Sequence, residues 1–314
     1  MARRIGIAPA SPRPTFRRRC NLTNRQTAGR CNAAAPIRTA TGNRNLARKA
    51  ERSTVKIYVL CDIEGAAGVV DFETQAYPGG KYLDQARRWA TLELNALIDG
   101  CIEGGAEDIV VLDGHGPGGL SFELLHDRAR MILGRPLTVP FGIDESFDAL
   151  LLCGHHAMNH TPRGVLCHSW SSKSIDECRL NGEPIGEIGV NLAMGGSFGV
   201  RSVFVSGDDT ACDEARRYVP NLECAVTKQG LSRTSALSLS LPASRRLHHE
   251  RGLRALQRLS EFEPFTVEPP YEFSTKHVEP VERTPLMKQN GVELIDDHTT
   301  VVRGDDLIDV LARR

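Results

Sequence analysis

The sequence lacks several features that would quickly assign it to a class of protein. Among its 314 residues no apolar run approaches the ~18–20 residues of a membrane-spanning helix. Its nine cysteines are odd in number and include no C-x-x-C pair, which argues against a disulfide framework and against a thiolate zinc site. We therefore expect no membrane span, and buried free thiols in a reducing compartment, the cytoplasm.

Acidic residues are absent from the first fifty positions. Residues 1–50 carry eleven Arg and one Lys, and the first acid is Glu51. No apolar periodicity accompanies these charges, so we predict a disordered basic extension over residues 1–53. It is open whether this is an organelle transit peptide, a tail for nucleic acid or a membrane surface, or an over-extended start. Because the whole chain is neutral, the remainder carries −12, and we expect no nucleic-acid partner.

From residue 55 onward, predicted strands alternate with predicted helices. Short apolar runs, rich in β-branched residues, predict strands in "VKIYVLC", "EDIVVLD", "FDALLLCGHH" and "VRSVFVSGDD". Helices are predicted in "YLDQARRWATLELNALIDGCIE", from about Gly186, and in "TACDEARRYVP", "ASRRLHHERGLRALQRL" and "GDDLIDVLARR", with a short one in "SFELLHDRAR". The alternation predicts an α/β fold with a mostly parallel sheet flanked by helices. A composition shift suggests a catalytic domain over residues 54–220 and a smaller C-terminal α/β subdomain over residues 221–314.

Three predicted strands end in side chains that commonly bind metals. In order along the chain these are Asp62 and Glu64, Asp113 and His115, and His155 and His156. The carboxyl ends of parallel strands share one edge of the sheet, so these groups are expected to converge there. Taken singly, each motif would be an ordinary surface turn, and His248–His249 is predicted to be an exposed pair. Their recurrence predicts a site for zinc or another mid-row divalent ion, since imidazole and carboxylate ligands occur without thiolate.

Alternation of side chains along extended backbone refines the choice of ligands. Asp62 and Glu64 are two residues apart and can point the same way. His155 and His156 are adjacent and would point to opposite sides, so only one of them is expected to be a ligand.

The motifs occur in the order and approximate spacing of a known family. They are "CDIEGAAGVV", "LDGHG", "CGHHA", "TPRGVLCHS" and "NGEPIGEIGVNLA", followed by "VFVSGDD", "VTKQGLSRTSA" and "DDHTTVV". Over roughly residues 55–312 the chain resembles the bacterial D-aminopeptidases, which are dinuclear zinc metallopeptidases. The resemblance implies hydrolysis of N-terminal D-amino acids, of the D-Ala type, from short peptides by a water that two zinc ions activate. It also implies a ring-like homo-oligomer.

The resemblance also implies roles for individual residues. Asp62 would bridge two ions, one held with Glu64 and His156 and the other with His115 and Glu187. His168 would be the catalytic residue, for proton transfer or oxyanion stabilisation. Apart from the resemblance, we interpret Asp113 as a partner that orients a histidine or a water.

The chain departs from the family pattern near the catalytic histidine. One extra residue lies in "AMNHTPRG", and Cys167 stands where Ser is common. Whether His168 still faces the metals is therefore a question for the structure. His155 replaces a typical aromatic and is expected to line the site, whereas His160 is expected at the surface.

Two other functions are compatible with these residues. One is a dinuclear metallohydrolase of different specificity, an L-aminopeptidase or small-amide amidase, because metal chemistry is indifferent to substrate handedness. The other is a non-catalytic protein that binds a peptide or a metal.

Overall fold

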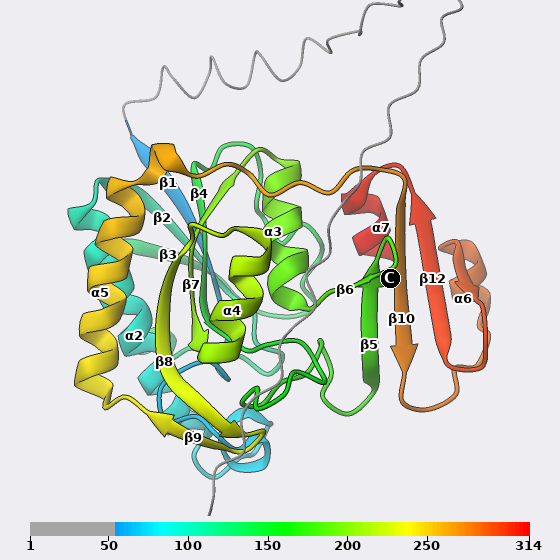
Figure 1. The fold of residues 1–314 in the computed structure, drawn as a ribbon, viewed down its shortest axis with the longest axis horizontal. Helices are drawn as coiled ribbons and strands as arrows, with labels where there is room; N and C mark the ends of the chain where they lie inside the picture. Colours follow the sequence, from blue (N-terminus) through cyan, green and yellow to red (C-terminus); the bar gives the residue numbers. More distant parts are fainter. Residues whose placement is uncertain (1–53) are drawn as a thin grey trace, which may run out of the picture. The chain divides into compact units, whose positions relative to one another are not determined.

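The computed structural model describes residues 54–314, so the predicted disorder of residues 1–53 lies outside the described residues. The described part contains two β-sheets (Figure 1). Sheet A has the strand order β3-β2-β1-β4-β7-β8-β9, and its strands are β1 (Val55–Cys61), β2 (Ala106–Asp113), β3 (Ala129–Ile132), β4 (Ala149–His155), β7 (Arg201–Asp208), β8 (Glu223–Ser232) and β9 (Ser235–Ser238). Sheet B has the order β11-β12-β10-β5-β6, and its strands are β5 (Ile175–Leu180), β6 (Glu183–Pro184), β10 (Tyr271–His277), β11 (Val292–Leu294) and β12 (Thr299–Gly304).

The strand order of sheet A reverses direction at the centre of the sheet. Its strands pair in parallel except β9, which is antiparallel to β8, whereas the pairs of sheet B are antiparallel. From β1 the chain proceeds through β2 and β3 towards one edge, and from β4 through β7 and β8 towards the other. The direction reverses between β1 and β4. Ligand sites of open α/β sheets form outside the carboxyl ends of the strands at such a reversal.

Helices cover both faces of sheet A. The pair α2 (Leu83–Glu103) and α5 (Leu241–Gln257) packs together on one face, and α3 (Glu187–Ser197) and α4 (Asp209–Tyr218) pack on the other (Figure 1). The remaining helices are α6 (Pro285–Gln289), α7 (Leu307–Arg313), the π-helix η1 (Phe72–Ala76) and the 3₁₀ turns η2 (Phe122–Leu124) and η3 (Leu259–Glu261). Helical spacing places Leu94, Leu97 and Ile98 on the buried face of α2, and each such burial is worth roughly 1.5–3 kcal/mol.

The predicted α/β architecture is confirmed, with one local difference. The predicted boundary between residues 220 and 221 stays a prediction; β8 and β9, which follow it, complete sheet A, and β5 and β6, which precede it, belong to sheet B. The predicted helix over residues 121–130 is wrong: it shortens to η2, and β3 begins at Ala129. Pairing of β3 with β2 in the sheet overrides the weak helical pattern.

Two observations on residues 54–314 concern membrane spans and cysteines. No helix there is long and apolar enough to span a bilayer. The seven described cysteines are buried free thiols.

A buried acid–base pair joins α2 to α5 and corrects the prediction for His248–His249. His248 is 0% exposed, with Nε2 4.0 Å from Glu93 Oε2, and only His249 is partly exposed. Burial alone would lower the pKa of His248, but Glu93 raises it to about 9. Burial also raises the pKa of Glu93. Both groups therefore bind protons more tightly in the folded protein than in the unfolded chain, and their contribution to stability falls as pH rises.

We expect Glu93→Gln to destabilise the protein most near pH 6. The contribution of His248 is full below its unfolded pKa of ~6.5 and is lost as pH rises through about 9, on the order of 3 kcal/mol. Chemical unfolding from pH 6 to pH 10 should show the gap between wild type and variant closing. Glu103→Gln, which removes the exposed partner of His249, is the matched control and should change stability little. A gap that does not vary with pH would contradict this account.

Candidate metal centre

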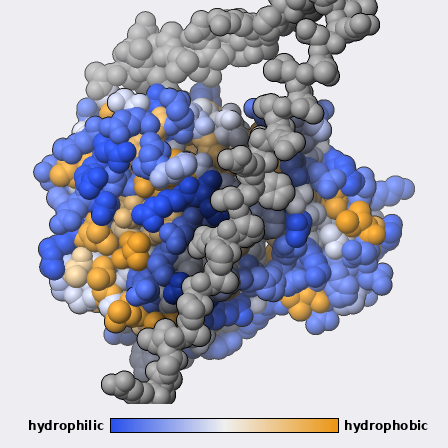
Figure 2. Space-filling model, viewed as in Figure 1, coloured by the Kyte–Doolittle hydropathy of each residue, from blue (hydrophilic) through white to orange (hydrophobic). Residues whose placement is uncertain are grey.

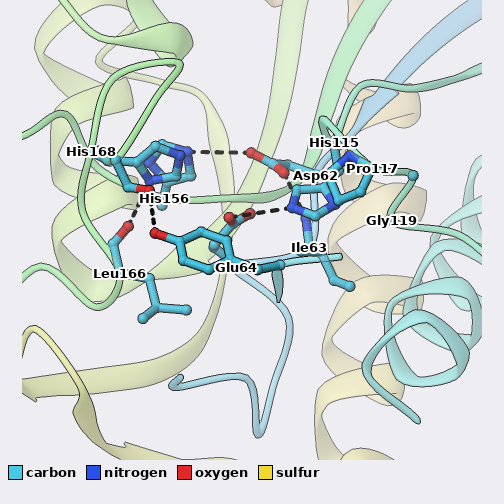
Figure 3. A network of polar contacts seen from close by, with 12 residues as sticks. Asp62, Ile63, Glu64, His115, Pro117, Gly119, His156, Leu166 and His168 are labelled. Atoms are coloured by element: carbon cyan, nitrogen blue, oxygen red, sulfur yellow. Dashed lines mark hydrogen bonds and ion pairs between the residues drawn. The ribbon is translucent and has the colours of Figure 1, made fainter. Parts of the chain in front are cut away.

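Acidic and histidine side chains from four elements meet at the reversal point of sheet A. They are Asp62 and Glu64 after β1, His115 after β2, His156 after β4, and Glu187 at the start of α3. All are buried except Glu187, whose side chain is 19% exposed. Figure 3 shows Asp62 and Glu64 between His115 on one side and the rings of His156 and His168 on the other. The convergence that the strand ends predicted is present.

These side chains form two adjacent groups. In one, ligand atoms of Asp62, Glu64 and His115 lie within 4.8 Å of one another, and His115 Nε2 is 3.5 Å from Glu64 Oε1. In the other, ligand atoms of His156, His168 and Glu187 lie within 4.8 Å of one another, and His156 Nε2 is 3.3 Å from Glu187 Oε1. The same nitrogen is 3.4 Å from Asp62 Oδ2. Asp62 therefore contacts both groups.

The composition of the two groups differs from the one that the resemblance implies. His115 lies with Glu64 rather than with Glu187, and His156 lies with Glu187. Strand order explains the difference, because β2 and β4 flank β1 on opposite sides. Since α3 packs beside β4 and β7, Glu187 reaches the histidine of β4.

Two glycines allow the loops after β1 and β4 to touch. Gly65 N donates to Gly154 O at 2.7 Å, and Asp62 N donates to Cys153 O at 2.9 Å. A Cβ at Gly65 would come within 2.3 Å of the backbone of β4, and Gly154 has φ +74°. The glycines of "DIEG" and "CGHH" are thus required by the close approach of the two loops that carry Asp62 and His156.

Burial and mutual attraction oppose each other in the cluster. Burial, and next the charge of Glu64, raise the pKa of Asp62 to about 7. Burial would also raise the pKa of Glu187, but the ring of His156 lowers it to about 2. Burial would lower the pKa of His115, yet Glu64 raises it to about 9. The buried carboxylates thus draw positive charge into the cluster.

The unpartnered atoms fit a divalent cation. Among the described residues, Glu64 Oε2, His115 Nδ1 and His156 Nε2 are buried without a hydrogen-bond partner. His156 Nδ1 donates to Ala157 O at 3.0 Å, so in the neutral ring the lone pair on Nε2 faces the carboxylates of Asp62 and Glu187. A lone pair and two carboxylate oxygens repel one another unless a proton or a metal cation lies between them, and, against the effect of burial, Glu187 and Asp62 raise the pKa of His156. Imidazole with carboxylate is also a typical zinc ligand set.

His168 faces this cluster despite the extra residue that precedes it. Its ring stacks on His156, with centroids 3.8 Å apart and planes inclined by 19°, and Phe72 packs edge-on against it. His168 Nδ1 donates to Leu166 O at 2.8 Å, which leaves Nε2 unprotonated in the neutral ring. Burial, and next the charge of His156, lower the pKa of His168. These features suit a side chain that accepts a proton.

A cleft of about 580 Å³ opens over the cluster. Residues 114–117 form part of its lining, with Tyr77 and residues 170–173 also lining it. Tyr77 Oη and Ser172 Oγ are 2.5 Å apart. A volume of this size accommodates a short peptide.

Comparison with known proteins identifies the family. The family model described as D-aminopeptidase, Peptidase_M55, matches residues 55–313. The chain belongs to this family. A D-aminopeptidase of Bacillus subtilis (strain 168) is 33% identical over 215 residues, which cover 68% of this chain and 77% of the relative.

A solved structure agrees with that assignment. It is the Zn-dependent D-aminopeptidase DppA from Bacillus subtilis, described as a self-compartmentalizing protease. It superposes with a TM-score of 0.75 at 28% identity, covering 82% of this chain and 95% of that one. The chain is accordingly a metallo-aminopeptidase of the D-aminopeptidase family.

Predictions from the sequence also concern His155, His160 and Asp113, which lie near the candidate metal ligands in the sequence. His155 is 1% exposed, both ring nitrogens lack partners among the described residues, and burial lowers its pKa to about 4. His160 is exposed and pairs with Asp176 at 2.7 Å. Asp113 accepts from the backbone nitrogens of Gly119 and Leu120, so its described contacts order the turn after His115 rather than orient a histidine.

Sequence reasoning did not single out the backbone and side-chain groups that brace the ligands. Trp170 N donates to Glu187 Oε1 at 2.7 Å. Arg135 donates to the carbonyl oxygens of Gly116, at 3.0 Å, and of His115. These contacts link positions far apart in the sequence, and no local motif predicts them.

We expect the two groups to lose metal separately. After reconstitution with zinc and gel filtration, elemental analysis should find one ion fewer per chain in His115→Ala and in His156→Ala. Asp62→Asn should lose both ions, because Asp62 contacts both groups. His160→Ala is the control and should match wild type. Loss of both ions from His115→Ala, with Asp62→Asn keeping one, would show that the groups are wrongly divided.

Proposed function

We propose that the protein is a zinc-dependent D-aminopeptidase that removes D-configured N-terminal residues, of the D-Ala type, from short peptides. We further propose that each subunit holds two zinc ions. The observation that carries the proposal is the pair of buried ligand groups sharing Asp62 at the floor of a cleft. Zinc dependence and the substrate class are supported by what the relatives are described to be.

The ligand groups would divide the two ions between them. Asp62, Glu64 and His115 would hold one ion, and Asp62, His156 and Glu187 the other. When bound, zinc supplies a Lewis acid for the scissile carbonyl and acidifies the attacking water.

His168 would act as a general base and then as a general acid in the reaction. Its Nδ1–H is committed to Leu166 O, so the ring can gain a proton only at Nε2. Nε2 would accept a proton during attack and donate it to the departing amine, and as N–H it would also stabilise negative charge on the carbonyl oxygen. Stacking on His156 fixes the plane of the ring before substrate arrives.

The metal centre would favour one end of the substrate. With the carboxylates of Asp62, Glu64 and Glu187 engaged in holding zinc, the unprotonated amino group of a peptide would be the substrate group suited to an open ligand position. A peptide held by its amino end presents its first peptide bond to His168. This polarity suits removal of a single N-terminal residue.

We propose that the protein acts as a homo-oligomer in the cytoplasm. The solved relative is described as self-compartmentalizing, and the described thiols are free. Leu231, Leu237 and Leu239, on or just after the β8–β9 hairpin, are exposed. Figure 2 shows hydrophobic patches at lower left, over the region of this hairpin, on a mostly hydrophilic face. Contact between copies would cover this surface.

Purified protein with zinc should hydrolyse D-Ala-D-Ala and D-Ala-Gly, and should leave the corresponding L-peptides intact. Release of free amino acids, measured by chromatography, checks the prediction, with chelator-treated protein as the control. Turnover of L-peptides alone would establish an L-aminopeptidase, and turnover of small amides alone would establish an amidase.

His168→Ala should keep its zinc while kcat falls by about 10²–10⁴-fold, the usual contribution of a positioned acid–base group. Elemental analysis and steady-state kinetics measure the two quantities. His160→Ala, an exposed histidine in the same segment, should retain wild-type kcat. Near wild-type activity in His168→Ala with both ions bound would remove His168 from the mechanism.

A further inference from the structure

The segment from Lys228 to Arg233, within "VTKQGLSRTSA", has no role in the site described above. It forms the end of β8 and the turn into β9. It lies against two loops: residues 62–69, which carry Asp62 and Glu64, and residues 160–170, which carry His168.

The ammonium group of Lys228 donates hydrogen bonds to three carbonyl oxygens of the first loop. The side chain is 1% exposed, and its Nζ donates to the carbonyl oxygens of Glu64, Ala66, at 2.8 Å, and Val69, at 2.6 Å. An ammonium group has three N–H donors, so all three are used on this loop. Displacing the Glu64 backbone would leave a buried charge without one of its three partners, which is unfavourable.

The second loop has a backbone that needs support from outside. Arg163, Leu166 and Trp170 have φ of 64°, 53° and 53°. Each left-handed non-glycine residue costs about 1–2 kcal/mol and persists only where surrounding contacts impose it. Leu166 is the residue whose carbonyl fixes the ring of His168.

Arg233 supplies contacts of that kind. Its backbone oxygen accepts from Leu166 N at 2.7 Å, and its Nε and Nη2 donate to Cys167 O at 3.2 and 3.1 Å. Its guanidinium lies 5.3 Å over the ring of Phe72, which packs against His168. Arg233 thus contacts the His168 segment through the main chain, the side chain and a neighbouring ring.

We propose that Lys228 and Arg233 are positioning residues of the active site, with separate tasks. Lys228 holds the loop that presents Asp62 and Glu64 to the metals. Arg233 holds the backbone that aims His168. The inference rests on the proposed function only for the task of Arg233, since metal retention is measurable without any substrate.

The two tasks predict opposite patterns in kinetics and metal binding. Arg233→Met should lower kcat by about 10–100-fold, the usual effect of removing an outer partner, with KM and zinc affinity unchanged. Arg233→Lys should recover part of kcat, because an ammonium group donates to Cys167 O but lacks the paired donors of guanidinium. Lys228→Met should instead lower zinc affinity by about 10–100-fold, measured by competition with a chromogenic chelator.

Arg201→Met is the matched control for Arg233. Arg201, on β7, likewise donates from Nε to a backbone carbonyl, that of Phe262 at 3.0 Å. The control should leave kcat and zinc affinity at wild-type values. If Lys228→Met does not fold, Lys228→Gln, which keeps two N–H donors, replaces it.

The outcomes separate this inference from the proposed function. The Arg233 half is overturned if Arg233→Met behaves like Arg201→Met, or if its kcat falls in step with zinc loss. Wild-type zinc affinity in the Lys228 variants, or failure of both to fold, overturns the Lys228 half. If wild type binds zinc but hydrolyses no peptide, the proposed function and the Arg233 task fail, while the zinc measurements still decide the task of Lys228.

Discussion

The constraint on which the site depends is the burial of three carboxylates in one cluster. Asp62, Glu64 and Glu187 lie together at the carboxyl end of the sheet, largely shielded from water. Carboxylates in such a place are costly unless positive charge joins them. The histidines can supply that charge as protons, but two divalent ions supply it more completely, and they satisfy nitrogen and oxygen atoms that otherwise lack partners.

The fold meets this constraint by bringing rigid elements to one point. β1 and β4 are parallel neighbours from which the chain proceeds in opposite directions, and the loops after them touch through Gly65 and Gly154. The neighbouring strand β2 adds His115, and α3 adds Glu187. The β8–β9 hairpin contacts the loop after β1 through Lys228 and the loop that carries His168 through Arg233. The candidate ligands on strand ends and the proposed catalytic side chain on a braced loop are held before substrate binds, as an efficient site requires.

The parts of this arrangement that are local in sequence were predictable, and those that depend on long-range contacts were not. The strand runs and the acids and histidines that follow them predicted the sheet and the convergence of Asp62, His115 and His156. Which candidate ligands lie next to one another depended on strand order, and the spacing of the motifs along the sequence does not encode that order. His248 was predicted exposed because its own helix is rich in arginine, yet contact with Glu93 on α2 buries it. Lys228 resembles any strand lysine until the three carbonyls that it contacts are known.

The central claim is that two ions share Asp62 within reach of His168. Anomalous diffraction at the zinc edge, from crystals grown with zinc and a D-dipeptide analogue, tests it most directly. The account predicts two peaks, one beside Glu64 and His115 and the other beside His156 and Glu187. Asp62 should contact both ions, and the ring of His168 should face the analogue. A single peak, or two peaks with His168 turned away from the analogue, would contradict it.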